Sequence, residues 1–138
     1  MYHLLHVRRL LTVLRYLWAL PNSALGLTLA LLSRLAGEAR AQVLHGVLEI
    51  YGAGVRRLLR RLLPTKSAVE ALTLGHVVLA CDLPTLESTR AHEAVHVRQY
   101  ERWGPLFLPA YWIAGALAAR RGGDAYRDNP FEKQARSL

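Results

Sequence analysis

Cysteine is almost absent from this sequence. Cys81 is the only one among 138 residues, so an internal disulfide framework and a zinc site built from cysteines alone are both excluded. The sequence also has no internal repeat and no low-complexity tract, and its length is that of one ordinary domain. We therefore expect a single small globular unit.

Acidic residues are few as well. The chain has 10 of them against 18 basic residues, which gives a net charge of +8, and 52% of its residues are hydrophobic. No nucleic-acid recognition motif accompanies the arginines, so nucleic acid is not an expected partner. Basic residues that bracket long apolar runs are typical of membrane proteins, and we expect membrane lipid to be a partner.

The clearest apolar run lies in residues 1–36. Tyr16 to Ser33 contains eighteen residues without a charge, which is long enough to cross a bilayer. Pro21 and Gly26 weaken a straight helix, so a kinked or partly interfacial segment stays open. We expect 1–36 to be a retained membrane-anchoring helical segment and 37–138 to be the folded domain.

Two other interpretations of this run are open. A cleaved signal peptide could use the small residues at 39–41, although Arg34 and Glu38 lie between the run and that site. The run could also be a buried helix of a soluble protein. Neither alternative changes what is expected downstream of residue 36.

The middle of the chain mixes strand and helix patterns. Residues 42–52 predict a hairpin with its turn at His45-Gly46, and 54–63 predict an amphipathic helix with four arginines on one side. This basic face could lie on anionic lipid or face solvent. Residues 71–80 are a β-rich run that Gly75 interrupts.

The sequence HEAVH at residues 92–96 is the main chemical motif. Thr85 as N-cap and a stop at Gly104-Pro105 predict one helix over 86–103. Four residues apart on a helix, His92 and His96 share a face and can bind one metal ion. Glu93 stands beside that ion, where its carboxylate can take a proton from the attacking water.

A third metal ligand has to come from another part of the chain. Glu101 is five residues after His96, which turns it away from the histidines on the same helix. Near the end, Asn129 can cap a short helix in which Pro130 and Glu132 lie in the first turn. Glu132 is either the third ligand or the reciprocal partner of its own helix cap.

These elements resemble a zincin metallopeptidase of the gluzincin type. HEAVH and the later EKQA match in order, and HEAVHVRQ is similar to small membrane-associated bacterial relatives. The resemblance covers roughly residues 70–138. It implies His92, His96 and Glu132 as Zn²⁺ ligands, Glu93 as catalytic base, and an edge strand over 72–80 that holds an extended peptide.

The fold class expected is α+β, a small zincin-like domain with a short β-sheet, an HExxH helix and a C-terminal helix. The expected function is a membrane-associated zinc metallopeptidase, with the bacterial inner membrane as its location and a peptide or protein as substrate. The alternative is a non-catalytic zincin-like membrane subunit or assembly factor that binds a protein partner. The retained Glu93 favours catalysis, and the absence of a large substrate domain favours binding.

Three further residues and one segment complete the expectations. Tyr126 and His76 are candidates for stabilising a transition state, and Gln99 either supports its helix or contacts a ligand from behind. Residues 104–119 are sixteen uncharged residues with two prolines. They predict a re-entrant or interfacial element, or else a helix buried over the zinc helix.

Overall fold

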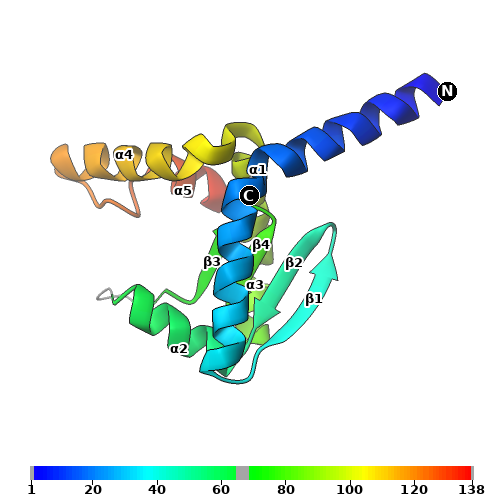
Figure 1. The fold of residues 1–138 in the computed structure, drawn as a ribbon. Coiled ribbons are helices and arrows are strands. Elements are labelled where there is room, and N and C mark those ends of the chain that lie inside the picture. Colours follow the sequence, from blue (N-terminus) through cyan, green and yellow to red (C-terminus); the bar gives the residue numbers. More distant parts are fainter. Residues whose placement is uncertain (1, 65–68, 138) are drawn as a thin grey trace.

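The computed structural model describes residues 2–64 and 69–137, and its fold is α+β as expected (Figure 1). A small mixed sheet of four strands lies between helices, and a long apolar helix precedes it. The elements, in chain order, are α1 (Tyr2–Ala36), β1 (Arg40–Leu44), β2 (Val47–Tyr51), α2 (Ala53–Leu62), β3 (Ala71–Leu74), β4 (Val77–Ala80), α3 (Leu83–Trp103), the 3-10 turn η1 (Gly104–Leu106), α4 (Phe107–Arg120) and α5 (Pro130–Arg136).

The sheet has the strand order β1-β2-β4-β3. Strands β1 and β2 are antiparallel, β3 and β4 are antiparallel, and β2 runs parallel to β4. The β1–β2 turn has positive φ at both His45 and Gly46, the backbone that a two-residue type I′ turn requires, so the predicted hairpin is confirmed. A second turn at Gly75-His76 divides the predicted run 71–80 into two strands. Of these two strands, β3 lies at an edge of the sheet and β4 is inside it.

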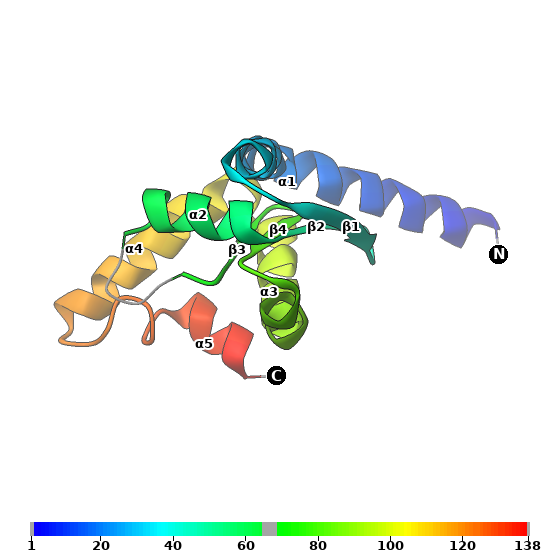
Figure 2. The same ribbon diagram turned by 90° about the horizontal axis from the view of Figure 1, so that it is seen from below.

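Helices cover both faces of this sheet (Figure 2). On one face, α1 and α2 pack Ala30, Val55 and Leu59 against alternate residues of β2 and β4, namely Ile50, Val77 and Leu79. On the other face, α3 packs Leu86 and Val97 against Val78 and Ala80. Burying each large aliphatic side chain contributes about 1.5–3 kcal/mol, so these two layers carry most of the core.

Helix α1 has two halves with different surroundings. The second half packs on the sheet through small and polar residues at helical spacing, which are Ala19, Asn22, Ser23, Gly26, Ala30 and Ser33. Residues 3–18 are all exposed, and this half extends away from the body of the molecule (Figure 1). Helix α1 bends between these two halves (Figure 1). Pro21 lies in the middle of the helix, and its missing backbone N–H accounts for the bend. The predicted anchoring segment, residues 1–36, therefore ends where α1 ends. The second half of this helix, however, packs in the core.

By length and composition, α1 is also a candidate to cross a membrane. It is the one helix of this kind among residues 2–64 and 69–137, and 33% of its most apolar window is buried. Core helices of soluble proteins and signal sequences meet the same criterion.

Helix α3 begins earlier than its sequence predicts. Asp82 is the N-cap and its carboxylate accepts a hydrogen bond of 2.9 Å from the Thr85 backbone N–H, so Thr85 as N-cap is wrong. Both residues are good caps, and Pro84 in the first turn favours the earlier one because it has no N–H to satisfy. The helix stops at Gly104 as predicted. Gly104 has φ +55°, and a Cβ there would lie 2.4 Å from the Trp18 ring.

The apolar segment after α3 forms the turn η1 and helix α4, and α4 lies on the surface of the molecule. Of its residues, Phe107 and Gly115 are buried, while Trp112 and Ile113 are 67% and 60% exposed. The alternative that the sequence leaves open, a helix buried over the HExxH helix, is therefore wrong. Helix α5 begins as predicted, with the Asn129 side chain accepting a hydrogen bond from the Phe131 N–H.

Candidate metal centre

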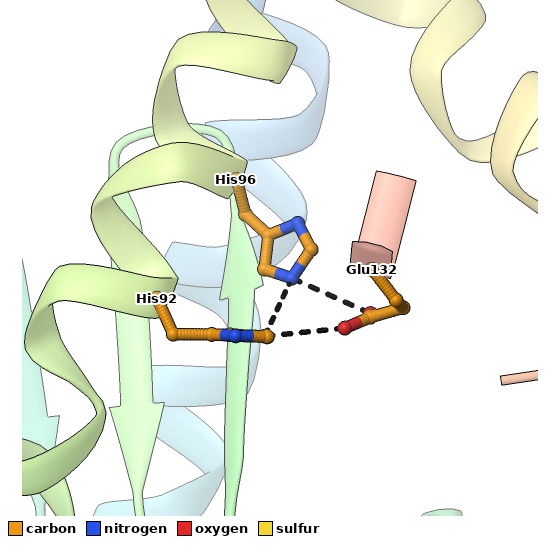
Figure 3. A group of neighbouring side chains, drawn as sticks. All are labelled: His92, His96 and Glu132. Carbon is orange, nitrogen blue, oxygen red and sulfur yellow. Dashed lines mark hydrogen bonds and ion pairs between the residues drawn. The ribbon is translucent and has the colours of Figure 1, made fainter. Parts of the chain in front are cut away.

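Three side chains from two helices meet beside the sheet. His92 and His96 point from α3 and Glu132 points from α5 toward a common point (Figure 3). The two Nε2 atoms are 3.1 Å apart. Glu132 Oε2 lies 3.2 Å from His92 Nε2, and Oε1 lies 3.4 Å from His96 Nε2. Residues separated by 36 positions in the sequence thus form one compact group of nitrogen and oxygen ligands.

The spacing of these atoms is near that of a zinc site. Zinc binds histidine nitrogen and carboxylate oxygen at about 2.0–2.2 Å with tetrahedral angles, which places neighbouring ligand atoms about 3.3–3.5 Å apart. The two Nε2 atoms, 3.1 Å apart, are close to that value, and each faces a different oxygen of the Glu132 carboxylate, at 3.2 and 3.4 Å. With one ligand atom from each residue, the three atoms lie within 4.8 Å of one another. A metal ion held by one carboxylate oxygen would therefore need the Glu132 side chain to move.

Glu132 is directed at the histidines and away from its own helix cap. In a capping box its carboxylate would accept from the Asn129 backbone N–H, but that N–H donates to the Tyr126 carbonyl at 3.2 Å. The Asn129 side chain also holds α5 against α4, because its Nδ2 donates to the Tyr111 carbonyl at 3.0 Å. The cap thus fixes the start of α5 and leaves Glu132 free to face α3.

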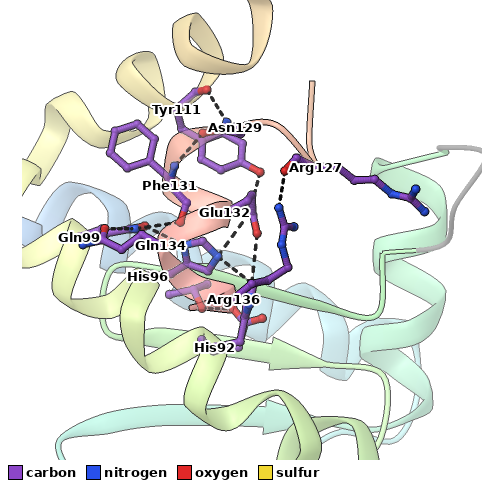
Figure 4. A network of polar contacts seen from close by, with 12 residues as sticks. His92, His96, Gln99, Tyr111, Arg127, Asn129, Phe131, Glu132, Gln134 and Arg136 are labelled. Carbon is purple, nitrogen blue, oxygen red and sulfur yellow. Dashed lines mark hydrogen bonds and ion pairs between the residues drawn. The ribbon is translucent and has the colours of Figure 1, made fainter. Parts of the chain in front are cut away.

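Gln99 determines which ring nitrogen of His96 carries the proton. Its Oε1 accepts from His96 Nδ1 at 2.8 Å, and its Nε2 donates to the Phe131 carbonyl and to Gln134 Oε1 at 3.1 and 2.7 Å (Figure 4). Because both amide hydrogens go to α5, the amide oxygen has to face the imidazole. In its neutral form, His96 then carries its proton on Nδ1 and presents the Nε2 lone pair to the centre. Of the two roles that the sequence leaves open for Gln99, the structure shows a contact with His96.

Tyr111 is a contact that the sequence does not indicate. Its hydroxyl donates to Glu132 Oε1 at 2.8 Å, and it comes from α4, 21 residues before the glutamate. Burial opposes ionisation of Glu132, but hydrogen bonds from His96 and Tyr111 and the histidine charges outweigh it and lower the pKa of the carboxyl. Burial also opposes the charge on His96, but Glu132 and Gln99 raise its pKa nevertheless. The lowered pKa favours the anionic form of Glu132 in the folded chain.

Glu93 lies on the neighbouring side of α3, buried against β3. It is 6% exposed, and its Oε2 accepts a short hydrogen bond from the Thr73 hydroxyl. Thr73 is held in turn by Tyr100, whose hydroxyl donates to the Thr73 carbonyl at 2.9 Å. The edge strand and the HExxH helix are therefore joined at the residue that the motif identifies as the base.

The two candidate transition-state residues lie in different places. Tyr126, in the loop before α5, is 54% exposed, and burial of its hydroxyl together with the charge of Glu132 raises its pKa to about 12. It is therefore a protonated donor at neutral pH beside the third ligand. His76 lies at the β3–β4 turn instead, where it pairs with Glu101 at 3.0 Å and stacks on Tyr16. The structure does not bring His76 into the group.

The donor set fits a zinc ion. Glu132 Oε2 is buried and has no hydrogen-bond partner among the described residues, its nearest contact being the ion pair of 3.2 Å with His92 Nε2, although buried carboxylate oxygens are normally paired. Two imidazoles and one carboxylate are the ligands of catalytic zinc sites, which keep a fourth position open. The same cation would satisfy the buried oxygen and both Nε2 lone pairs.

Comparisons with family models, with curated proteins and with solved structures find no match for this chain.

Proposed function

We propose that this chain is a zinc-dependent peptide hydrolase that works at a membrane. The observation that carries the proposal is the group of His92, His96 and Glu132, whose ligand atoms lie within 4.8 Å of one another while Glu93 stands one residue along the same helix. A structural zinc site has four protein ligands, whereas this group offers three. A carboxylate beside an open position is the arrangement for activating water.

Zinc bound there would supply a Lewis acid that polarises a carbonyl and makes a water molecule more acidic. Glu93 would accept a proton from the attacking water and return it to the leaving nitrogen. The Thr73 hydroxyl holds one carboxylate oxygen of Glu93 and so leaves the other for this transfer. Thr73 is thus a positioning residue for the base.

Tyr126 is the donor best placed to stabilise negative charge on the carbonyl oxygen. It is exposed in the loop before α5, the charge of Glu132 contributes to a raised pKa of its hydroxyl, which keeps its proton at neutral pH, and Arg136 lies over its ring at 5.7 Å from the centroid. A phenol that stays protonated can donate to an oxyanion throughout the reaction.

Strand β3 supports a peptide as the substrate. It forms one edge of the sheet, so the backbone groups on its outer side have no strand partner within the described chain. An extended peptide can add to such an edge by backbone hydrogen bonds. Thr73 on this strand touches Glu93, which would bring the peptide backbone next to the base.

The membrane location rests on α1. The helix is long and apolar enough to cross a bilayer, and its first half is fully exposed. Such a surface is costly to leave in water. The resemblance to small bacterial relatives makes the bacterial inner membrane the proposed location.

A second candidate is a non-catalytic membrane subunit that uses the same fold to bind a partner. The observation that favours it is the burial of Glu93, which is 6% exposed and already bonded to Thr73. A base engaged in this way could serve packing alone.

Metal analysis and activity of variants separate the candidates. Wild-type protein should contain about one zinc per chain, and His96→Ala should lose most of it because a ligand is removed. Glu93→Gln should keep zinc, while hydrolysis of a quenched fluorescent peptide mixture should fall by roughly a hundredfold or more. Glu87→Gln, an exposed change on the same helix, is the matched control.

These measurements test the metal centre, the catalytic base and the non-catalytic alternative separately. Full zinc content in His96→Ala would refute the metal centre. Equal turnover in Glu93→Gln and wild type would refute the role of the base. A wild type that holds zinc and cleaves no peptide would favour the non-catalytic subunit.

A further inference from the structure

We propose that the first half of α1 and the outer side of α4 form one surface that lies flat on an anionic lipid bilayer. We call residues 3–18 together with 106–117 the two-helix surface. The inference rests on the proposed membrane location and specifies its mode, but it requires no metal. The partner of this surface is lipid.

The apolar side of the first half of α1 faces away from the sheet. Leu4, Val7, Leu11, Leu14 and Trp18 follow each other at steps of three and four residues, which places them in one stripe, and they are 47–69% exposed. The opposite side is fixed by Tyr16. Its hydroxyl donates to the Gly46 carbonyl at 2.6 Å and its ring stacks on His76 at 3.9 Å.

Helix α4 shows the same division. Its inner side carries Phe107, Gly115 and Tyr111, whose hydroxyl reaches Glu132. At the opposite positions of the turn and helix, Leu106, Ile113 and Leu117 are 59%, 60% and 45% exposed. No charged residue occurs between Trp103 and Arg120, so this outer side is apolar along its whole length.

Helix α1 is hydrogen-bonded to the end of α3 and to the turn η1, from which α4 starts. Trp18 Nε1 donates to the Arg102 carbonyl at 3.4 Å, and Asn22 Nδ2 donates to the Gly104 carbonyl at 2.9 Å. From this junction they extend in opposite directions along one end of the molecule (Figure 1). Both apolar sides thus start from one junction, and we infer that they form one surface.

The charges of the two-helix surface suit anionic lipid. Neither residues 1–37 nor residues 102–123 contain an aspartate or glutamate. Arginines lie within the first half of α1, at positions 8, 9 and 15, and at the end of α4, at 120 and 121. A second copy of the chain would bring like charges together with no acidic residue to pair them, whereas anionic headgroups attract each basic residue by about 1 kcal/mol.

Tryptophan placement points to the headgroup region. The chain has three tryptophans, and all belong to α1, the end of α3 or α4: Trp18, Trp103 and Trp112 are 47%, 40% and 67% exposed. Tryptophan is enriched where headgroups meet hydrocarbon, because its ring is apolar and its N–H is polar.

Packing of the second half of α1 favours a flat position over a crossing. The apolar run Tyr16 to Ser33 presents Asn22, Ser23 and Ser33 to the folded body, so a crossing there would draw the sheet into the hydrocarbon. Helix α4 has 14 residues. At about 1.5 Å per residue it reaches roughly 21 Å, less than the roughly 30 Å of a bilayer core.

Vesicle flotation with the full chain tests the surface. We expect binding to vesicles of phosphatidylcholine with phosphatidylglycerol, and roughly tenfold weaker binding to phosphatidylcholine alone. Leu14→Asp and Ile113→Asp should each weaken vesicle binding by roughly tenfold or more, because each places a charge on the side that would be buried in the lipid. Val43→Asp is the matched control, since Val43 on β1 is 71% exposed and lies outside the two-helix surface. Lipids brominated on the acyl chain should quench tryptophan fluorescence in the wild type.

Several results would overturn the inference. Unchanged binding in both surface variants would do so. So would a dimer in solution that these variants dissociate in the absence of lipid, since the occupant would then be a second copy. Retention in the bilayer after an alkaline carbonate wash would indicate a crossing. His96→Ala should bind vesicles as the wild type does, so failure of the metal centre leaves this test intact.

Discussion

Gln99 Oε1 accepts the Nδ1 proton of His96 at 2.8 Å, while the amide hydrogens of Gln99 are held by α5. One side chain therefore both orients a metal ligand and ties the ligand's helix to the helix that carries Glu132. Partners of this kind raise the basicity of a ligand histidine and fix its tautomer.

Replacing Gln99 should weaken metal binding without removing a ligand. In Gln99→Ala, His96 loses the acceptor that keeps Nε2 unprotonated, and zinc affinity should fall by roughly 10- to 100-fold. Competition with a chromophoric chelator measures the change. Arg98→Ala, an exposed substitution next to it in the sequence, should leave affinity unchanged. Wild-type affinity in Gln99→Ala would mean that His96 needs no such partner.

Tyr111 gives a second test, because its hydroxyl touches the third ligand from another helix. Tyr111→Phe keeps the ring in the cluster with Phe107 and Phe131 but removes a hydrogen bond to an ionised carboxylate. Such bonds contribute about 1.5–3 kcal/mol, so zinc affinity should fall by roughly tenfold or more. Trp112→Phe, exposed on the same helix, is the control. Equal affinities in the two variants would show that Tyr111 only packs.

Local rules predict a good part of this fold. The histidines of HEAVH share a face because of helical spacing, and the stops and caps at Gly104 and Asn129 follow from their backbone preferences. The His45-Gly46 turn follows from the need for positive φ at both positions. Each of these features is determined within a few residues of sequence.

What the sequence does not predict depends on distant contacts. The run 71–80 has no periodicity that reveals a turn, and its division becomes visible when β2 pairs with β4 and leaves β3 at the edge. Tyr111 is a generic aromatic residue in an apolar run, and only the packing of α4 on α5 brings it to Glu132. His76 is a reasonable candidate by type, but the β3–β4 turn directs it to Glu101.

The loss of folding stability at acidic pH should depend on Glu49. Burial opposes its charge, but hydrogen bonds from Arg90 and Gln42 and the charge of Arg90 lower its pKa. A lowered pKa in the folded state contributes stability that is complete above the unfolded pKa and is lost as pH falls through the folded pKa. Glu49→Gln should cost about 1–3 kcal/mol at neutral pH and much less near about pH 3.

Urea unfolding of chelator-treated protein at both pH values measures this difference, because chelation removes any metal contribution. Glu87→Gln, an exposed glutamate on α3, should show little change at either pH. A cost in Glu49→Gln that is the same at both pH values would mean that packing, and not the ion pair with Arg90 at 2.9 Å, stabilises this part of the core.

Glu132→Gln separates ligation from capping with one conservative change. As part of a capping box, glutamine would serve as well as glutamate, and the variant would be nearly silent. The observed contacts run to His92, His96 and Tyr111, so the lost negative charge should weaken zinc binding severely, by roughly a hundredfold or more. Chelator competition gives the affinity, and thermal unfolding of the metal-free variant gives its stability. Wild-type affinity would leave the centre without its third ligand, whereas lower affinity with near-native stability would establish Glu132 as a ligand.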